Sequence, residues 1–508
     1  MLKKNIKEYV IQLEKFNLLQ KKVKIEENLD KKIEKVSYSS NDVEKGTLFV
    51  CKGNNFKEEY LVSSIEKGAE IYISEREYNV DIPGIIVTNV QDALSIVSQV
   101  YYNSPADKLT LIATSGTKGK STTAYYIKYI LDEYAAANSL KDTAIISSID
   151  TYDGITSEES HITTPESLDL QGHLNNAVNA GLKNVVMEVS SQALKYGRVY
   201  NLLLDYGIFL NISEDHISAI EHADFADYFA SKLKIFKQVK TVAVNLDADH
   251  IEEILDASKA ADKVISFSVK NKEADVYAYN IRKQGLDTVF SVKSSTLDMD
   301  FVLTMPGLFN VENALAAICI AEDMQIPAKY IYEGLKKARS SGRMEIYSSE
   351  DKKVVAIVDY AHNKLSFQKL FESTRAEYPG RKISIIFGCP GGKAFLRRKD
   401  LGIEAGKYAD TIYLVAEDPG YEAPSSISKE ISEYVKEFTD NFSIIDDRGE
   451  AIHEAILSVK GDEVILITGK GNETRQKFGS TYVPCKSDVE YVTEYIKEYN
   501  EVKAMKIK

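Results

Sequence analysis

Short apolar runs alternate with longer amphipathic stretches along most of the chain. The apolar runs 109–112, 185–187 and 241–244 have the length and composition of buried strands. The stretch 124–131, like others between the runs, repeats its apolar residues at helical spacing. Strands that alternate with helices form parallel sheets with helices on both faces. The pattern therefore predicts an α/β fold with a mostly parallel sheet for residues 106–340.

Breaks in this pattern divide the chain. A length of 508 residues predicts about three domains, at roughly 100–200 residues each. The segment 101–108, which contains Asn-Ser-Pro-Ala-Asp, has the composition of a linker. We expect an N-terminal domain in residues 1–105, with an amphipathic helix and short strands, and a central domain in residues 106–340. In residues 341–508, four strand runs separated by helices predict a Rossmann-like, doubly wound sheet.

Composition narrows the class of protein. Sixty-three basic and 76 acidic side chains leave a net charge of −13, which argues against nucleic acid as a partner. The cysteines stand singly, without metal-binding or redox spacing, so we expect free thiols in a reducing compartment. The Lys-rich start lacks the apolar core of a signal peptide, and no apolar run approaches the ~20 residues of a membrane span. We expect a cytoplasmic protein that does not contact a membrane.

The segment 113–123 is rich in glycine, follows the apolar run 109–112 and precedes the helical stretch 124–131. Strand, glycine loop, Gly-Lys-Ser and helix is the order of a phosphate-binding loop. The glycines let the backbone curve around phosphate oxygens, and the helix presents free N–H groups to them. Lys120 can reach the outer phosphates, and the hydroxyl of Ser121 suits a magnesium ion. The segment predicts a site for a nucleoside triphosphate.

Polar residues follow other strands of the central domain. Glu188 ends the run 185–187 and is placed to bind magnesium beside the loop, or else it is a solvated or helix-capping residue. His216 follows a later apolar run and, taken alone, is more typical of a structural histidine. Lys232 lies in the predicted amphipathic helix 228–236, where a lysine ordinarily faces solvent.

Four turns of the C-terminal domain also carry polar side chains. Each follows a predicted strand, and they comprise residues 358–362, 388–393, 417–420 and 469–473. Any one of them could be a turn and nothing more. The carboxyl ends of parallel strands meet at one edge of a sheet, so together the turns predict a binding crevice.

These segments together resemble the Mur ligase family, the ATP-dependent amide-bond ligases of peptidoglycan precursor synthesis. The resemblance is strongest to the members that add the third residue of the stem peptide, and it covers essentially the whole chain. The matching strings, in family order, are residues 115–123, 163–167, 188–194, 197–199, 215–216, 228–236, 307–314, 342–345, 359–362 and 469–473. The resemblance implies a three-domain architecture with a central ATP-binding domain and a C-terminal Rossmann-like domain.

The resemblance also implies catalytic and metal-binding roles. Lys120 and Ser121 would hold the phosphates of ATP and a first magnesium ion, together with Glu188. His216 would bind a second magnesium ion. Lys232 matches the lysine that the family carbamylates, and the resulting anion would support that second metal.

Further contacts are implied residue by residue. The nucleotide contacts would be Gly116, Thr117, Lys118, Gly119, Thr122, Asn310, Asn313, Arg343, Asp359, Tyr360 and His362. The contacts to the UDP-linked precursor would be Ser39, Ser40, Thr163, Thr164, Ser190 and Arg198. The amino acid would be bound near Glu417, Asp418, Glu422, Gly469 and Glu473.

The implied chemistry activates a carboxylate. Transfer of the γ-phosphoryl group of ATP to a carboxylate of UDP-MurNAc-L-Ala-D-Glu makes an acyl phosphate, and magnesium ions offset the charge. A free amino acid then attacks through its neutral amine and expels phosphate. We expect the enzyme to act as a monomer.

Position 420 bears on which amino acid is added. Relatives that add diaminopimelate carry an arginine here, in an Asp-Asn-Pro-Arg string, and its guanidinium binds the distal carboxylate. Gly420 cannot do so, and a buried carboxylate left unpaired is costly. Lysine carries an ammonium instead, which suits the nearby acids, so we favour L-lysine over diaminopimelate or ornithine.

Other departures leave alternatives open. Ala113 and Thr114 occupy positions where glycine is common, Gln192 replaces a common histidine, and residues 39–41 replace Asp-Ser-Arg. A non-catalytic relative that binds the precursor or ATP would tolerate such changes. A second alternative is another ligase on the same framework, such as a folylpolyglutamate or cyanophycin synthetase. The Thr-Thr-Pro-Glu-Ser string and the N-terminal domain favour the muramyl enzyme over this second alternative.

Overall fold

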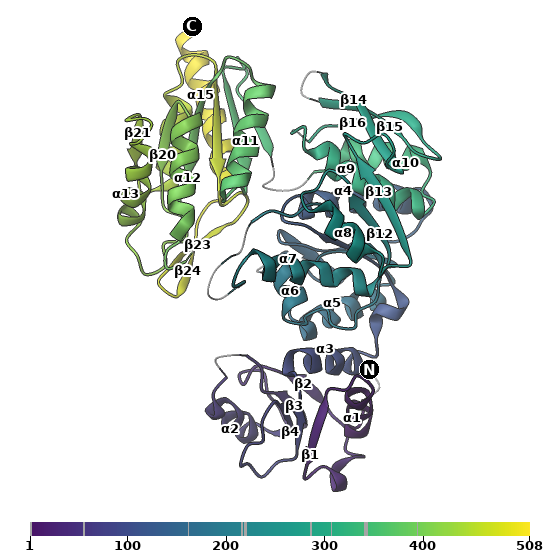
Figure 1. Ribbon diagram of the computed structural model, residues 1–508. Helices are drawn as coiled ribbons and strands as arrows, with labels where there is room; N and C mark the ends of the chain where they lie inside the picture. The colour runs from purple at the N-terminus through teal and green to yellow at the C-terminus, as the bar shows by residue number, and fades with distance from the viewer. Residues whose placement is uncertain are drawn as a thin grey trace. The chain divides into compact units, whose positions relative to one another are not determined.

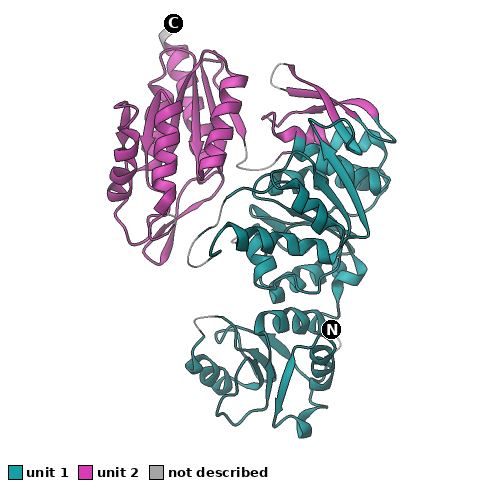
Figure 2. Cartoon of the chain, viewed as in Figure 1, with its two compact units in different colours: residues 1–277, 293–297, 312–334 teal, residues 278–292, 298–311, 335–508 magenta. Residues whose placement is uncertain are grey.

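The structure is a computed structural model with alternating helices and mostly parallel sheets, which confirms the predicted α/β class (Figure 1). It describes residues 3–53, 56–160, 162–214, 217, 221–284, 287–305, 307–339, 344–393 and 395–507. The chain forms two compact units (Figure 2), which are residues 1–277, 293–297 and 312–334, and residues 278–292, 298–311 and 335–508. The division into three domains at residues 105 and 340 stays a prediction.

The N-terminal sheet has the strand order β1-β5-β4-β3-β2, and only β1 is antiparallel to its neighbour. Its strands are β1 (Leu19–Val23), β2 (Lys35–Ser37), β3 (Thr47–Val50), β4 (Ala69–Ser74) and β5 (Gly84–Val87). The helices are α1 (Ile6–Lys15), α2 (Glu58–Glu66), α3 (Val90–Tyr101) and the 3-10 turn η1 (Glu26–Asn28). Alternate strand residues face opposite sides, so Leu48 packs with α1 and α3 whereas Phe49 packs with α2.

The expected linker is short and largely structured. Helix α3 continues to Tyr101, and a 3-10 turn, η2 (Pro105–Lys108), leads directly into the next strand. Ser104 takes a left-handed conformation, with φ of 46°, between them. The chain therefore turns sharply at the end of α3.

The central sheet has the order β16-β15-β14-β13-β12-β11-β6-β10-β7-β8-β9. Its strands are β6 (Thr110–Ser115), β7 (Ala144–Ile146), β8 (Asp150–Tyr152), β9 (Ser157–Glu159), β10 (Asn184–Glu188), β11 (Leu204–Phe209), β12 (Val239–Asn245), β13 (Lys263–Ser268), β14 (Val276–Gln284), β15 (Asp287–Lys293) and β16 (Asp298–Leu303). Its helices are α4 (Lys120–Ala137), α5 (Ser167–Asn179), α6 (Ser191–Lys195), α7 (Phe225–Leu233), η3 (Lys234–Gln238), α8 (Ile251–Ser258), α9 (Asn310–Asp323) and α10 (Ala328–Lys337).

Strand β6 lies between β10 and β11 and is parallel to both. The ends of these three strands therefore meet at one edge of the sheet, which is where the polar residues of the sequence were expected. The predicted helix 228–236 is partly wrong, because α7 ends at Leu233 and the chain continues as the tighter η3.

The C-terminal sheet has the order β17-β18-β22-β19-β20-β21, and all neighbours except β17 and β18 are parallel. Its strands are β17 (Glu345–Ser348), β18 (Val354–Asp359), β19 (Lys382–Phe387), β20 (Thr411–Leu414), β21 (Phe442–Ile444) and β22 (Glu463–Thr468), and a hairpin is formed by β23 (Arg475–Phe478) and β24 (Thr481–Pro484). Its helices are α11 (Lys364–Glu377), α12 (Phe395–Tyr408), α13 (Pro424–Val435), α14 (Arg448–Leu457) and α15 (Asp488–Ile507).

Both faces of the C-terminal sheet are covered. Val464 and Leu466 of β22 pack into one apolar cluster with α11, α12 and α13, whereas Ile465 and Ile467 pack into another with α14 and α15. A strand that is buried on both faces has a continuous run of apolar residues, and β22 has such a run.

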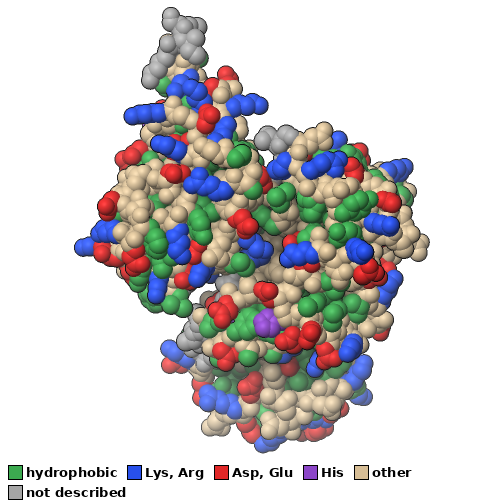
Figure 3. Space-filling view, turned by 45° about the horizontal axis from the view of Figure 1, so that its top comes forward, with side chains coloured by type: hydrophobic (Ala, Val, Ile, Leu, Met, Phe, Trp, Pro, Cys, Tyr) green, Lys and Arg blue, Asp and Glu red, His purple; other side chains and the backbone are tan. Residues whose placement is uncertain are grey.

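The surface is mixed in charge. Basic and acidic side chains are interspersed on the visible face of each unit (Figure 3). Of the helices that the structure describes, none combines the length and apolar character needed to cross a membrane.

Candidate functional site

The loop between β6 and α4 has the backbone of a phosphate-binding loop. Gly116 and Gly119 have φ of +149° and +86°, which glycine adopts without steric cost. A Cβ atom at Gly119 would lie 2.2 Å from Oδ1 of Asn313, so this predicted nucleotide residue lies against the loop. Ala113 and Thr114 belong to β6 and are buried there. Their departure from glycine therefore falls in the strand, where the hydroxyl of Thr114 donates to the carbonyl of Lys120 at 3.3 Å.

Asn211, just after β11, anchors the loop and was not among the predicted site residues. Its backbone carbonyl accepts the N–H of Thr117 at 3.1 Å. Its side chain accepts the N–H of Lys118 at 2.9 Å and donates to the carbonyl of Lys118 at 3.1 Å. The sequence feature that could have identified Asn211 is its position as a polar residue directly after an apolar strand.

Two lysines, the half-buried Lys120 and the buried Lys232, donate to one carbonyl group. The Nζ atoms of Lys120 and Lys232 donate to the carbonyl oxygen of Gly116 at 3.0 and 2.8 Å. Lys232 is only 2% exposed, so the interpretation of a solvent-facing lysine is wrong for this residue. Its Nζ lies 5.1 Å from the ring of Tyr228, whose hydroxyl lies 3.0 Å from Oγ1 of Thr117. Helix α7 thus packs its lysine directly against the loop.

Glu188 lies beside the start of α4. It is 1% exposed, so a solvated side chain is excluded. Its Oε1 accepts hydrogen bonds from the N–H and hydroxyl of Ser148, at 2.8 and 3.1 Å. The Ser148 hydroxyl is in turn 3.1 Å from that of Ser121. Ser148 was not predicted, because nothing in its turn sequence distinguishes it from a loop residue.

The donor set at Glu188 fits magnesium. Oε2 of Glu188 makes no hydrogen bond to any residue that the structure describes. This carboxylate oxygen and the Ser121 hydroxyl are ligands of the type that magnesium prefers. The predicted ligand His216 lies outside the described residues. Within the part of the chain that the structure describes, no group of three or more His, Cys, Asp or Glu side chains could hold a metal.

The predicted precursor residues Thr164, Ser190 and Arg198 lie together next to Glu188. Oγ1 of Thr164 donates to the carbonyl of Glu188 at 2.9 Å and accepts the N–H of Ser190 at 3.0 Å. The carbonyl of Thr164 accepts Nη1 of Arg198 at 3.2 Å. Arg198 is further held by Glu166, whose Oε1 accepts Nε at 3.0 Å.

Other predicted residues of the N-terminal and central sheets have different surroundings. Ser39 and Ser40 are half-buried in the turn after β2, where the carbonyl of Ser40 accepts Nζ of Lys67 at 2.6 Å. Thr163 is half-buried and Thr122 is buried near the start of α4. Gln192 donates to Oε1 of Glu221 at 2.9 Å, so its amide is used within the fold.

The turns of the C-terminal sheet gather acidic residues around one lysine. Nζ of buried Lys470 lies 3.1 Å from Oδ1 of Asp418 and also pairs with Glu473. Gly469 approaches Glu417 so closely that a Cβ atom there would lie 2.2 Å from Oε2. The structure thus brings Glu417, Asp418, Gly469 and Glu473 together, as predicted for four turns at one sheet edge. Lys470 was not predicted, although it stands in the Gly-Lys-Gly-Asn-Glu string.

Glu417 is the most perturbed acid of this group. Burial raises the pKa of its carboxyl group to about 7, while nearby Arg448 and Lys470 act in the opposite direction. At neutral pH the group is therefore divided between its protonated and ionised forms.

Glu422 differs from the other predicted amino-acid contacts. Both of its oxygens accept Nη2 of Arg398, at 2.9 and 3.0 Å, and Oε1 also accepts the N–H of Gly392 at 2.5 Å. The hydrogen bond from Arg398 lowers the pKa of Glu422. This carboxylate is already neutralised within the fold.

A buried ion pair supports the turn that carries Lys470. Arg448 at the start of α14 and Asp488 at the start of α15 form two hydrogen bonds, of 2.6 and 2.7 Å. Nη2 of Arg448 also donates to the carbonyl of Thr468 at 2.6 Å, and Asp488 accepts the N–H of Gly471 at 3.0 Å. The pair therefore holds the turn from both ends.

The predicted nucleotide residues of this unit adjoin the same turn. The carbonyl of Asp359 accepts the N–H of Gly469 at 3.1 Å, and the hydroxyl of Tyr360 accepts the N–H of Asn472 at 3.2 Å. Nδ1 of His362 lies 2.6 Å from the carbonyl of Tyr360. Asn310 is buried at the start of α9, and Arg343 lies outside the described residues.

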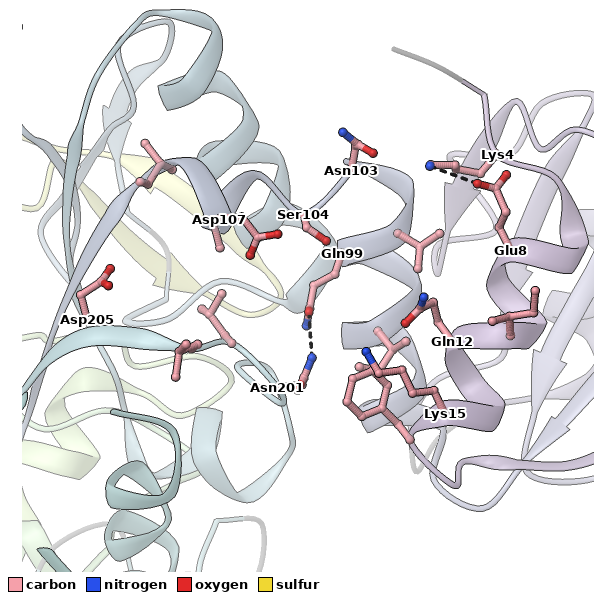
Figure 4. Close-up of a pocket in the computed structure, with 18 of the residues that line it drawn as sticks. Lys4, Glu8, Gln12, Lys15, Gln99, Asn103, Ser104, Asp107, Asn201 and Asp205 are labelled. Carbon is pink, nitrogen blue, oxygen red and sulfur yellow. Dashed lines mark hydrogen bonds and ion pairs between the residues drawn. The ribbon is translucent and has the colours of Figure 1, made fainter. Parts of the chain in front are cut away.

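A pocket of about 810 Å³ lies elsewhere, between α1, α3, η2 and the strands β11 and β12 (Figure 4). Lys4 points to Glu8 across 3.1 Å, and the amide of Asn201 donates to that of Gln99 at 3.3 Å. Among the described residues that line it there is no predicted site residue. Charged side chains in its lining pair with one another, Lys4 with Glu8 and Lys240 with Asp205.

The fold and the site define an α/β protein with a phosphate-binding loop at the edge of a mostly parallel sheet. Residues 114–321 match the model of the Mur ligase middle domain, and residues 342–471 match that of the Mur ligase glutamate ligase domain. Together the two matches cover more than half of the chain, and the chain belongs to the Mur ligase family. The predicted family is thereby confirmed.

Individual relatives extend the similarity to nearly the whole chain. A UDP-N-acetylmuramoyl-L-alanyl-D-glutamate–L-lysine ligase of Enterococcus faecalis is 37% identical over 473 residues, which are 92% of each chain. The protein of the same name from Streptococcus thermophilus is 37% identical over 91% of this chain and 92% of its own. A solved UDP-N-acetylmuramoyl-L-alanyl-D-glutamate–2,6-diaminopimelate ligase is 21% identical, with a TM-score of 0.66 over 98% of this chain and 99% of its own, and it shows the shared fold.

We predict that Gly119→Ala destabilises the protein more than Gly181→Ala. Both glycines have left-handed φ, so each substitution adds about 1–2 kcal/mol of backbone strain. Only at Gly119 does the new Cβ meet a neighbour, Oδ1 of Asn313, whereas nothing lies within 4 Å of it at Gly181. Urea unfolding of both variants measures the difference. Equal losses of stability would contradict the packing of Asn313 against the loop.

We also predict that Glu417→Gln stabilises the protein at high pH. The pKa of Glu417 is raised to about 7 in the folded state, so the folded protein binds more protons than the unfolded chain between about pH 4.5 and 7, and stability falls as pH rises through this window. Glu417→Gln does not lose stability in this way. Its free energy of unfolding, relative to that of the unmodified protein, should therefore rise by about 2–3 kcal/mol from pH 5 to pH 8.

Glu422→Gln is the matched control for this measurement. The pKa of Glu422 is lowered, so its ionised form stabilises the fold, and this contribution is lost as pH falls through the folded pKa. The variant should be the less stable protein at pH 8, with the difference shrinking in acid. If the free energies of unfolding of Glu417→Gln and of the unmodified protein change with pH in the same way, the raised pKa of Glu417 is wrong.

Proposed function

We propose that this protein is an ATP-dependent ligase that adds L-lysine to UDP-MurNAc-L-Ala-D-Glu. The observation that carries the proposal is the position of Thr164. Its hydroxyl bonds to Glu188 and Ser190, and its carbonyl accepts Arg198. Residues assigned to the precursor and a residue assigned to the nucleotide site are therefore joined directly. The names of the relatives from Enterococcus faecalis and Streptococcus thermophilus support the same reaction.

The phosphate-binding loop would hold ATP. The backbone of Gly116–Gly119 and the first turn of α4 present N–H groups, and Lys120 supplies a positive charge for the outer phosphates. Ser121 and Glu188 would hold magnesium, which, when bound, offsets the charge of the phosphate oxygens. The precursor carboxylate then attacks the γ-phosphorus, the bond to the β,γ-bridging oxygen breaks, and an acyl phosphate and ADP result.

Lys232 would act as a carbamate. Its neutral amine attacks carbon dioxide, which forms an N–C bond and releases a proton. The carbamate nitrogen keeps one N–H, so the bond to the carbonyl of Gly116 can persist. The two carbamate oxygens turn a positive side chain into an anion beside the loop. Such an anion suits a second magnesium ion, with His216 as a further ligand.

The acidic turns of the C-terminal sheet would select the amine. Lys470 pairs with the carboxylates of Asp418 and Glu473, and Glu417, which is partly ionised at neutral pH, lies close to the same turn. The excess of negative charge suits the side-chain ammonium of lysine. Gly420 offers no guanidinium for a distal carboxylate, so diaminopimelate would place a further carboxylate near these acids.

The reaction sets the remaining assignments. The α-amine of lysine attacks the acyl carbon in its neutral form, and phosphate leaves with the electrons of the broken C–O bond. The partners are the UDP-linked precursor and a free amino acid, and the protein acts as a monomer in the cytoplasm. Ala113 and Thr114 lie in β6, and the loop that follows keeps the left-handed glycines Gly116 and Gly119.

The decisive experiment measures product mass. The purified protein is incubated with ATP, magnesium, UDP-MurNAc-L-Ala-D-Glu and one amine, which is L-lysine, meso-diaminopimelate or L-ornithine. We expect a lysine adduct and ADP, both dependent on the precursor. No adduct with any amine, from protein that still binds the precursor, would favour the non-catalytic alternative. An adduct with diaminopimelate alone would refute the selectivity for lysine.

We predict that Lys232→Ala lowers the rate of ADP release by roughly 100-fold or more, as the removal of a key electrostatic group does in other enzymes. Lys234→Ala is the matched control, because Lys234 is exposed two residues further along and its substitution should leave the rate unchanged. Added formate should restore part of the activity of Lys232→Ala if the native group is an anion. Full activity in Lys232→Ala would exclude a catalytic role.

A further inference from the structure

Lys52 forms an ion pair that no assigned role explains. It follows β3, and its Nζ lies 2.5 Å from Oε2 of Glu166, the residue before α5. The other oxygen of Glu166 accepts Nε of Arg198 at 3.0 Å. One carboxylate therefore bridges two cations, one from the N-terminal sheet and one from the central sheet.

The bridge is poorly solvated and keeps unused donors. The side chains of Lys52, Glu166 and Arg198 are 17%, 20% and 11% exposed. Nη2 of Arg198 makes no hydrogen bond to the residues that the structure describes. Among the same residues, the ammonium of Lys52 has Glu166 and the ring of Tyr38, 5.0 Å from its centroid, as its neighbours. Two cations with spare N–H groups and one shared carboxylate leave capacity for an anion.

Nearby acids do not cancel this capacity. Asp169 is exposed, and its Oδ2 accepts the hydroxyl of Tyr38 at 2.5 Å. Its charge is therefore screened by water and already used by a donor. The net charge of Lys52, Glu166 and Arg198 together is therefore +1.

The position of Lys52 matches the middle of an elongated ligand. Strands β2 and β3 are parallel neighbours, so Lys52 and the turn of Ser39 and Ser40 follow them at the same sheet edge. On the other side, Glu166 connects Lys52 to Arg198 and the Thr164 group. A ligand with uridine at one end and a peptide at the other carries its diphosphate between them.

We propose that Lys52 is a further binding residue for the UDP-linked precursor, that it and Arg198 bind an oxyanion of that ligand, and that Glu166 positions both cations. The inference rests on the proposed function for the identity of the ligand. The oxyanion is a phosphate of the diphosphate or a carboxylate of the peptide. Glu166 contacts no ligand atom in this scheme; it keeps the two cations oriented and apart.

The test measures binding, so it does not depend on turnover. Calorimetric titrations with UDP-MurNAc-L-Ala-D-Glu, UDP and MurNAc-L-Ala-D-Glu compare Lys52→Met, Lys52→Arg and Glu166→Gln with the unmodified protein. Lys35→Met is the matched control, because Lys35 lies on β2 and pairs with Asp42 at 2.5 Å. We expect Lys52→Met and Glu166→Gln to weaken precursor binding about tenfold or more, as loss of a charge-assisted contact does. Lys52→Arg should keep most of the affinity, and Lys35→Met all of it.

The smaller ligands identify the bound group. Weakened binding of UDP alone assigns a phosphate, and weakened binding of the sugar dipeptide alone assigns a carboxylate. Unchanged affinity of Lys52→Met for all three ligands overturns the inference, and so does a loss of thermal stability without a loss of affinity. If the unmodified protein binds the precursor and ligates no amine, the proposed function fails while these titrations still decide the role of Lys52.

Discussion

The carbonyl group of Gly116 accepts hydrogen bonds from the half-buried Lys120 and the buried Lys232, and the rest of the central site depends on this arrangement. Because both Nζ atoms lie within 3.0 Å of the same oxygen, they are within about 6 Å of each other. At an effective dielectric constant near 20, two like charges at this separation repel by on the order of 3 kcal/mol. A phosphate group or the conversion of one lysine to an anion relieves that repulsion. The loop, α4 and α7 are thus packed in a way that favours an anionic ligand.

Buried charges elsewhere in the chain are also held by fixed partners at strand ends. Glu188 is oriented by Ser148, and the turn that carries Lys470 is held by Arg448 and Asp488. Hydrogen bonds of this kind set the direction of a charge before any ligand arrives. The cost of desolvation is met when the fold forms, so a ligand does not have to reorganise the site.

Local signals predicted the parts of the site that local structure determines. Lys120 and Glu188 were predicted because the end of a strand and the start of a helix fix where their side chains lie. The burial of Lys232 was not visible in its amphipathic helix, since it depends on α7 packing against a loop 116 residues earlier. Glu422 looked like a free acid for the same reason, because its partner Arg398 comes from another helix, α12. The helix 228–236 was misplaced because its last turn tightens into η3.

Two groups of charged side chains, one at an edge of the central sheet and one at an edge of the C-terminal sheet, differ in sign. In the central sheet, Lys120 and Lys232 concentrate positive charge at the phosphate-binding loop. In the C-terminal sheet, Asp418 and Glu473 pair with Lys470, and the partly ionised Glu417 lies close to the same turn. Fields of opposite sign on one sheet edge would partly cancel, and each substrate would then meet a weaker complementary potential. Separate sheets let one attract a polyanion while the other attracts an ammonium. Each sheet edge therefore favours ligands of one sign, an anion at the phosphate-binding loop and a cation at the turns of the C-terminal sheet.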